Sequence, residues 1–321
     1  MTDIERERIE QEARRRAGAG GPPTRYGEVV NRYLGVAGYT ATAPHRITPA
    51  AHPTGSAPPA VPPTVPPSAR TVVVGVDDSP ASFVAVDHAA IEAELRGWDL
   101  RLLHVQHGGG SARRDRGAAL LTEFTDRVHA RSRTVAVAGR LVVGAPATTL
   151  LAEAHGAGLV VVGSRHGAVG AAFGRTVGAR IAADHDGPVL VVRVPGWPPG
   201  PEFASRPVVV GVDDSPDSTP AVEFALAEAR ARECDVVMLH ATGEAPAADE
   251  PAGRLADADG VRVHHRRVPG TAVAALVAAS DRAAAVVLGR RGRGSRAGAA
   301  PLGSVSRALV QRAHCPVFLV G

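Results

Sequence analysis

Lysine is absent from this 321-residue sequence, whose 36 basic residues are all arginine. A Walker-type phosphate loop needs a lysine on the phosphates, and a pyridoxal enzyme needs one for its Schiff base. A protein kinase needs one on a strand beside the nucleotide. The missing lysine therefore excludes these three classes.

Aromatic residues, cysteines and long apolar runs are also scarce. Aromatics make up 3% of a chain that is 45% hydrophobic, so the cores must consist of Val, Ala and Leu. Cys234 and Cys315 show no metal-ligand spacing, and we expect two small buried side chains in a reducing compartment. No apolar run reaches the roughly 18 residues of a membrane span, and the charged start is unlike a signal peptide. We therefore expect a cytoplasmic protein.

The charge balance gives little indication of a charged partner. The net charge is +4, with 36 basic and 32 acidic residues interspersed. Nucleic-acid binding would require a basic face with interleaved aromatics, which is missing. We expect neither nucleic acid nor a membrane as a partner. His104 and its repeat His240 lack further ligands nearby, so we interpret them as structural and expect no metal site.

Residues 1–70 differ in composition from the rest of the chain. Residues 2–16 carry five acidic residues and five arginines, a pattern that predicts a short charged helix. Between Pro22 and Pro67 lie 11 of the 26 prolines, which remove backbone donors and fix φ. This stretch is expected to be a mostly disordered, semi-rigid linker. One alternative stays open within it, a docking helix at residues 26–34.

After residue 70 the sequence repeats itself. Three segments recur 126 to 136 residues later: 71–80 at 207–216, 159–163 at 285–289, and 187–192 at 315–320. A repeat of more than a hundred residues indicates duplicated domains and not a solenoid. We expect one domain over residues 71–195 and a second over residues 206–321, shorter by ten residues between its first and fourth strands.

Each copy alternates short Val-rich runs with amphipathic stretches, which indicates a parallel sheet covered on both faces. We predict two tandem Rossmann-like α/β domains, each a five-stranded parallel sheet with helices on both faces. Strands are expected near residues 71–76, 99–105, 134–143, 158–163 and 188–193, and again near 207–212, 235–241, 261–268, 284–289 and 316–320. Helices are expected near 80–96, 115–132, 146–156 and 176–185, and a short one within 246–258.

The loop after the first strand of each copy begins with an aspartate, Asp77 or Asp213. Ligands of an open parallel sheet bind beyond the carboxyl ends of the strands, where the strand order reverses. A carboxylate at that point suits a metal, the ribose or base of a nucleotide, or a helix cap. Ser79 and Ser215 each precede a proline, which predicts that both serines are helix N-caps.

The loop after the fourth strand of the second copy, residues 289–306, is rich in glycine. Glycines let backbone N–H groups approach an anion closely. The helix that follows would turn its positive N-terminal end toward the same point. The hydroxyls of Ser304 and Ser306 would add donors, so the pattern favours a phosphate site.

This loop resembles the universal stress protein signature, Gly-x2-Gly-x9-Gly-Ser/Thr. Gly289, Gly292, Gly303 and Ser304 match it, with ten intervening residues in place of nine. The likeness covers about residues 71–321. It implies an ATP-binding α/β domain, with or without Mg²⁺, that pairs with a second copy, often through the last strand. Two copies on one chain would form that pair internally, and a further homodimer stays open.

The resemblance also implies which residues hold the nucleotide. The aspartate would contact adenine, its preceding residue and a strand-two residue would complete the base pocket, and loop residues would hold ribose and phosphates. In the second domain these are Val212, Asp213, Ala241, Gly289, Arg291, Gly292, Gly303, Ser304, Val305 and Ser306. In the first domain the weaker set is Asp77, Val105, Gly163 and Thr176. No catalytic residue and no metal ligand is implied.

The first copy departs from the signature. His166 stands in place of the second glycine, Arg175 stands in place of the third, and the loop is two residues shorter. A β-carbon where φ must be positive costs about 1–2 kcal/mol. We expect the first domain to bind nucleotide weakly or not at all and to act as a structural partner, unless Arg175 itself reaches a phosphate.

Two functional hypotheses follow from these observations. The first is an ATP-binding regulatory module of the stress response, with nucleotide held mainly by the second domain. The alternative is a nucleotide-independent scaffold or interaction protein with an unidentified protein partner. A slow ATPase ranks third, because no general base and no lysine is evident, and we do not expect an enzyme.

Overall fold

The computed structural model describes residues 24–34, 67–164, 176–193, 203, 205–213, 215, 218–243, 254–258, 260–292 and 302–321. The charged segment at 2–16 and most of the proline-rich stretch lie outside these residues. His166 and Arg175 also lie outside them.

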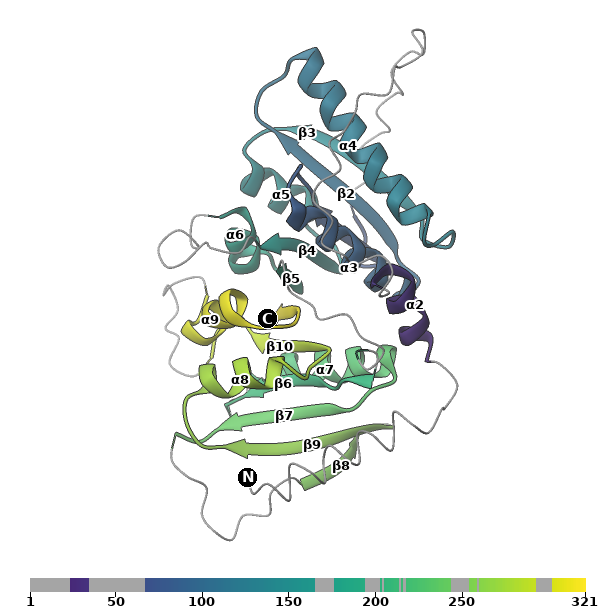
Figure 1. The fold of residues 1–321 in the computed structure, drawn as a ribbon. Helices are drawn as coiled ribbons and strands as arrows, with labels where there is room; N and C mark the ends of the chain where they lie inside the picture. Colours follow the sequence, from purple (N-terminus) through teal and green to yellow (C-terminus); the bar gives the residue numbers. More distant parts are fainter. Residues whose placement is uncertain are drawn as a thin grey trace.

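The described strands form one sheet of eleven strands (Figure 1). Domain 1 contributes β1 (Thr71–Gly75), β2 (Asp99–Gln106), β3 (Val137–Val143), β4 (Leu159–Ser164) and β5 (Val189–Arg193). Domain 2 contributes β6 (Val208–Val212), β7 (Val236–Ala241), β8 (Arg254–Ala258), β9 (Val261–Val268), β10 (Ala285–Gly289) and β11 (Val317–Val320). The order is β3-β2-β1-β4-β5-β11-β10-β6-β7-β9-β8. The predicted tandem α/β fold is confirmed.

Domain 2 differs from the prediction by one strand. Its β8 pairs antiparallel with β9, in the region where we expected a short helix. Ala258 pairs with Val261 across a two-residue connection, in which Gly260 has φ +83° and donates its N–H to Asp257 Oδ1 at 2.9 Å. An Asp-Gly pair at positions 259–260 is a strong hairpin signal. The turn therefore decides the local structure, and the second sheet half has six strands.

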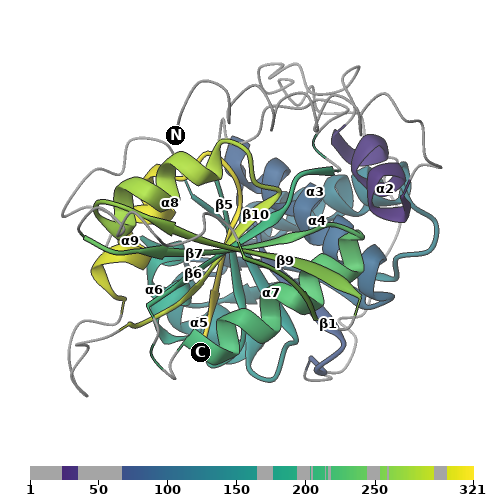
Figure 2. The same cartoon turned by 90° about the horizontal axis from the view of Figure 1, so that it is seen from below.

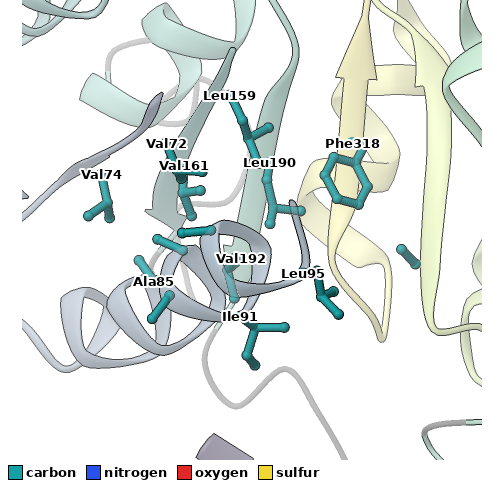
Figure 3. Packing of buried hydrophobic residues seen from close by; sticks show 14 of the residues in the cluster. Val72, Val74, Ala85, Ile91, Leu95, Leu159, Val161, Leu190, Val192 and Phe318 are labelled. Atoms are coloured by element: carbon teal, nitrogen blue, oxygen red, sulfur yellow. The ribbon is translucent and has the colours of Figure 1, made fainter. Parts of the chain in front are cut away.

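Helices cover both faces of the sheet (Figure 2). One face carries α3 (Pro80–Arg96), α4 (Ser111–His129) and α7 (Thr219–Arg232). The other carries α5 (Pro146–Ala154), α6 (Val177–Asp184), α8 (Ala272–Ser280) and α9 (Ser304–Arg312). Strand residues alternate between the two cores. Figure 3 shows Val72, Val74 and Val161 packed toward Ala85 and Ile91 of α3.

The two domains join through the last strand of each. Strand β11 pairs antiparallel with β5, with Phe318 opposite Leu190 and Val317 opposite Val191. All four side chains are buried. Each strand alone would be an unpaired apolar edge, which favours association with another strand. The pairing turns two sheet halves into one continuous sheet.

A buried charge cluster joins α3 to α7 across the domain boundary. Arg232 donates to Glu228 on its own helix at 2.9 Å and to Glu92 of α3 at 2.6 Å. Arg96 pairs with the same two glutamates. The repeat places these groups, because Glu92 and Arg96 recur 136 residues later as Glu228 and Arg232. Removing one partner from such a cluster costs about 3–5 kcal/mol, so it favours one arrangement of the domains.

Helix α2 (Arg25–Leu34) lies against α3 and α7 at this cluster (Figure 1). Its buried side chains recur at helical spacing: Tyr26, Val29, Val30 and Tyr33. The Tyr26 hydroxyl accepts a hydrogen bond from Arg232 at 2.7 Å, and the guanidinium lies 4.8 Å from the ring centre. The sequence allowed either a linker or a docking helix at residues 26–34, and the structure shows the docking helix.

Candidate functional site

The strand order reverses between β1 and β4 in domain 1 and between β6 and β10 in domain 2. Ligands of open α/β sheets bind beyond the carboxyl ends of the strands at such points. Asp77 follows β1 and Asp213 follows β6, while the loop that begins at Gly289 follows β10. The topology thus places the predicted residues of each domain at one edge of the sheet.

Each aspartate is fixed by its own loop. Asp213 Oδ1 accepts hydrogen bonds from the Ser215 N–H at 3.1 Å and from the Ser218 hydroxyl at 2.8 Å. Asp77 Oδ1 accepts the equivalent bonds from the Ser79 N–H at 3.0 Å and the Ser82 hydroxyl at 2.7 Å. The same turn therefore forms twice and holds one carboxylate oxygen of each aspartate in place.

The prediction that Ser79 and Ser215 cap the following helices is only partly right. Ser79 occupies the N-cap position of α3, but its side chain makes no capping bond. The N-cap position of α7 is held by Ser218, so that part of the prediction is wrong. The Ser79 and Ser215 hydroxyls donate to the aspartates instead, because a charged carboxylate is the stronger hydrogen-bond partner.

Two glycines bring the ends of the domain 2 loop together beside Asp213. The Gly303 N–H donates to the Arg290 carbonyl at 2.9 Å, and a β-carbon at Gly303 would lie 3.3 Å from that oxygen. A β-carbon at Gly292 would lie 3.2 Å from Asp213 Oδ2. Side chains at either position would therefore intrude on these close contacts. Asp213 and Gly303 lie 90 positions apart in the sequence, and the fold brings them close together at this point.

Helix α9 begins next to this point without a side-chain cap. Gly303 holds its N-cap position, and the first helical hydrogen bond runs from the Arg307 N–H to the Gly303 carbonyl at 3.0 Å. The N–H groups of Ser304, Val305 and Ser306 precede that bond. Such helix starts favour anions.

The two serines of this helix start differ in use. Ser304 is exposed, so its hydroxyl is accessible to a ligand. Ser306 is buried, and its hydroxyl donates to the Gly289 carbonyl at 2.8 Å. The Ser306 proton therefore ties α9 to β10, which differs from the expected donation to a phosphate.

The remaining predicted residues lie at the ends of β6 and β7 and at the loop start. Val212 ends β6 and Ala241 ends the neighbouring β7, with Val212 paired to His240. Both are half-buried. Arg291 is exposed after β10. In domain 1, His104 Nδ1 lies 2.9 Å from the Val76 carbonyl, which agrees with the structural role expected for it.

Domain 1 has a different helix start. Thr176 holds the N-cap position of α6, and its hydroxyl accepts the Ala179 N–H at 3.2 Å. One donor of that helix end is therefore already satisfied. Gly163, one residue before the end of β4, lies so close to α3 that a β-carbon would be 2.8 Å from the Ala81 carbonyl oxygen. Val105 is half-buried near the end of β2.

Arg290 is a residue of this region whose role the sequence analysis missed. It is 5% exposed, and its Nε donates across the domain boundary to the Ala182 carbonyl at 3.1 Å. Burial lowers its pKa to about 10. Alignment of the two copies could have pointed to Arg290, because domain 1 has Ser164 at the matching position.

Metal and disulfide chemistry find no support in the described part of the chain. No group of three His, Cys, Asp or Glu side chains there could hold a metal ion. Cys234 and Cys315 are both free thiols, and burial raises the pKa of Cys234 to about 11 and that of Cys315 to about 12. Within the same residues, no helix is long and apolar enough to cross a membrane.

Comparisons with known proteins agree with this architecture. The model of the universal stress protein family matches residues 68–193, 204–260 and 248–321. Universal stress protein Rv2623 of Mycobacterium tuberculosis is 31% identical over 289 residues, covering 78% of this chain and 96% of that protein. Universal stress protein Rv1996 of the same organism is 30% identical over 300 residues, covering 77% and 94%.

A solved structure shows the same fold. The crystal structure of a universal stress protein from Archaeoglobus fulgidus superposes with a TM-score of 0.59 at 19% identity, covering 78% of this chain and 98% of that chain. The duplicated sheet and the repeated aspartate turn agree with the three family matches along the chain. The chain therefore belongs to the universal stress protein family and carries two such domains in tandem.

Proposed function

We propose that domain 2 binds ATP, with Mg²⁺ carried on its phosphates, and that the chain is an ATP-binding regulatory module of the stress response. Domain 1 is its structural partner. The observation behind this proposal is the convergence of Asp213, Gly292 and Gly303 beside the uncapped start of α9. A fixed carboxylate, glycine backbone and a helix start without a side-chain cap suit the base, ribose and phosphates of one nucleotide.

Each part of the site has one task in this proposal. Asp213 takes the edge of the adenine, and its three bonds from Ser215 and Ser218 keep the carboxylate oriented. Val212 and Ala241 offer small apolar surfaces to the ring. The residues beside the ribose and phosphates are Gly289, Arg291, Gly292, Gly303, Ser304, Val305 and Ser306. Ser306 contributes its N–H, since its hydroxyl is already bonded.

Domain 1 is assigned no nucleotide in this proposal. Thr176 already satisfies a donor of α6, whereas α9 has no such cap. The aspartate turn is the same in both domains, so the contrast lies in the loop sequence and in the helix start. One nucleotide per chain is therefore expected.

Binding without hydrolysis is the favoured activity. The Asp213 carboxylate is engaged by donors of its own loop, so it is not placed as a free general base. A general base must reach the proton that it abstracts. Release of inorganic phosphate at a steady rate, absent in the Gly303→Arg variant, would instead support the slow ATPase.

Calorimetric titration of the nucleotide-stripped chain with Mg-ATP tests the proposal, with AMP titrated in parallel. One saturable site per chain is expected. Gly303→Arg, which introduces the residue type of position 175, should weaken binding by at least about tenfold, because a side chain there meets the Arg290 carbonyl. Thr176→Ala is the matched control in domain 1 and should leave affinity unchanged. Two sites per chain would contradict the assignment to domain 2.

A nucleotide-independent scaffold is the second candidate function. It is favoured by the docking of α2 on α3 and α7, which shows that the domain boundary already accepts a helix. This function predicts no heat and no thermal stabilisation at millimolar ATP. It also predicts that the Gly303→Arg variant keeps its partner.

A further inference from the structure

Arg290 carries a contact from the nucleotide loop of domain 2 into domain 1. Its Nε donates to the carbonyl of Ala182, in the last turn of α6, at 3.1 Å. A second nitrogen donates to the carbonyl of Gly187, ahead of β5. The third donates to the Gly321 oxygen at 3.0 Å. Two of the three acceptors belong to domain 1.

The backbone of the same residue holds the binding loop. The Arg290 N–H donates to the Val320 carbonyl at 3.0 Å, which continues the β10–β11 pairing by one residue. The Arg290 carbonyl accepts the Gly303 N–H at 2.9 Å, at the N-cap of α9. Arg290 thus connects three things: the end of β10, the start of α9 and the far domain.

The acceptors around the Arg290 guanidinium offset only part of the cost of burying its charge. The last carbonyls of a helix lack intrahelical partners and carry partial negative charge, so a guanidinium is stabilised at the end of α6. Arg290 is 5% exposed, and burial is the main reason that its pKa is lowered. A buried guanidinium that lost its acceptors would be costly, because unpaired buried charge is costly. The contact therefore resists displacement of the loop start.

Among the residues that the structure describes, domain 1 shows no equivalent anchor. The residue that matches Arg290 is Ser164, whose side chain is too short to cross the boundary. Domain 1 does send Arg193 into domain 2, where it donates to the Ala313 carbonyl at 2.9 Å. That contact reaches the C-terminal end of α9 and not its nucleotide-facing start. Arg193 and Arg290 therefore both donate to a backbone carbonyl of the other domain, but Arg193 makes no contact with the loop start that the structure describes.

We propose that domain 1 completes the nucleotide site of domain 2 by anchoring Arg290, which positions the loop start at residues 289–292 and the start of α9 for the phosphates. The identity of the ligand rests on the proposed function, whereas the anchoring of Arg290 rests on its hydrogen bonds alone. It gives domain 1 a task that needs no nucleotide of its own. Arg290 is a positioning residue here, since no part of it is assigned to the ligand.

The test compares Arg290→Ser, which copies Ser164, with Arg193→Ser in the full-length chain. Arg290→Ser should raise the Kd for Mg-ATP by about tenfold, the effect of losing hydrogen bonds to a charged group. Arg193→Ser removes a bridge of the same kind and should leave the Kd within about twofold. Arg290→Lys, which keeps the charge but cannot reach all three acceptors, should lie between them and serves if the serine variant does not fold.

Hydrogen exchange without nucleotide gives an independent readout. Arg290→Ser should speed exchange of the Gly303 N–H, and Arg193→Ser should not. Equal effects of the two variants on both readouts, or no effect of Arg290→Ser on either, would overturn the proposal. If the wild-type chain binds no nucleotide, the proposed function fails, and the exchange comparison alone still decides whether Arg290 anchors the loop.

Discussion

Replacing Tyr26 with phenylalanine should loosen helix α2 from the domain boundary without unfolding either domain. The change removes only the hydroxyl that accepts a hydrogen bond from Arg232 at 2.7 Å, and the ring remains under the guanidinium. A hydrogen bond to a charged group contributes about 1.5–3 kcal/mol. Arg232 is 2% exposed, so water does not readily replace the lost acceptor.

The expected magnitude follows from this loss. A ten-residue helix is marginal on its own, so α2 stays helical because it is docked. Weakening the docking by about 1.5–3 kcal/mol corresponds to about 10- to 150-fold more frequent opening. Burial raises the pKa of Tyr26 above its ordinary value, so the phenol stays protonated at neutral pH. The effect should therefore be the same at pH 6 and pH 8.

Hydrogen exchange of a peptide covering residues 24–34 measures this opening. Tyr33→Phe is the matched control, because the Tyr33 hydroxyl is buried with no hydrogen-bond partner among the described residues. Its removal should leave exchange unchanged or slow it. Equal acceleration by both variants would refute the reasoning, since the lost Arg232 contact could then not be the cause.

Three further changes have defined outcomes. Gly158→Ala places a β-carbon 2.1 Å from the Ala69 carbonyl oxygen, and this overpacking should lower stability in urea by about 1–3 kcal/mol, so an unchanged midpoint would contradict it. Burial lowers the pKa of His185 to about 4, below its unfolded value of about 6.5. The stability contributed by the neutral ring is complete above about pH 6.5 and is lost as pH falls toward 4, so His185→Ala should flatten that fall in Tm. Gly292→Ala places a β-carbon 3.2 Å from Asp213 Oδ2 and should weaken Mg-ATP binding in calorimetry, and wild-type affinity would remove Gly292 from the site.

The central strands β1, β4, β5, β10 and β11 were predictable because they are buried on both faces. Such a strand leaves a continuous apolar run, and the duplication presents each run twice. Helix α3 spans the predicted residues 80–96, since Pro80 suits its first turn and Gly97, at φ +62°, ends it. Local chemistry was sufficient in these places.

The prediction failed where local turn chemistry was overlooked or where the contacts are distant. The ten-residue deletion suggested a short helix, but the Asp-Gly pair at 259–260 directs a hairpin and gives β8. Tyr26 meets Arg232 from 206 positions away, and Arg290 meets Ala182 from 108. No local pattern encodes such pairs. Only alignment of the two copies, with Glu92 on Glu228, could have marked the charge cluster.

The two copies have similar sequences in the charge cluster at the domain boundary and different sequences in the loops after their fourth strands. The contacts of these residues explain the difference. Glu92 and Glu228 each neutralise arginines of both copies, so a change in one copy leaves a buried charge against the other. The loop of domain 2 crosses the boundary through Arg290, but its acceptors there are backbone carbonyls, so this contact requires no particular side chain in the other copy. Domain 1 can therefore carry Arg175 in its loop while domain 2 keeps Gly303. The symmetry of the sheet consequently does not imply two equal sites, and in the proposed function the expectation of one nucleotide per chain follows from the differences between the two loops.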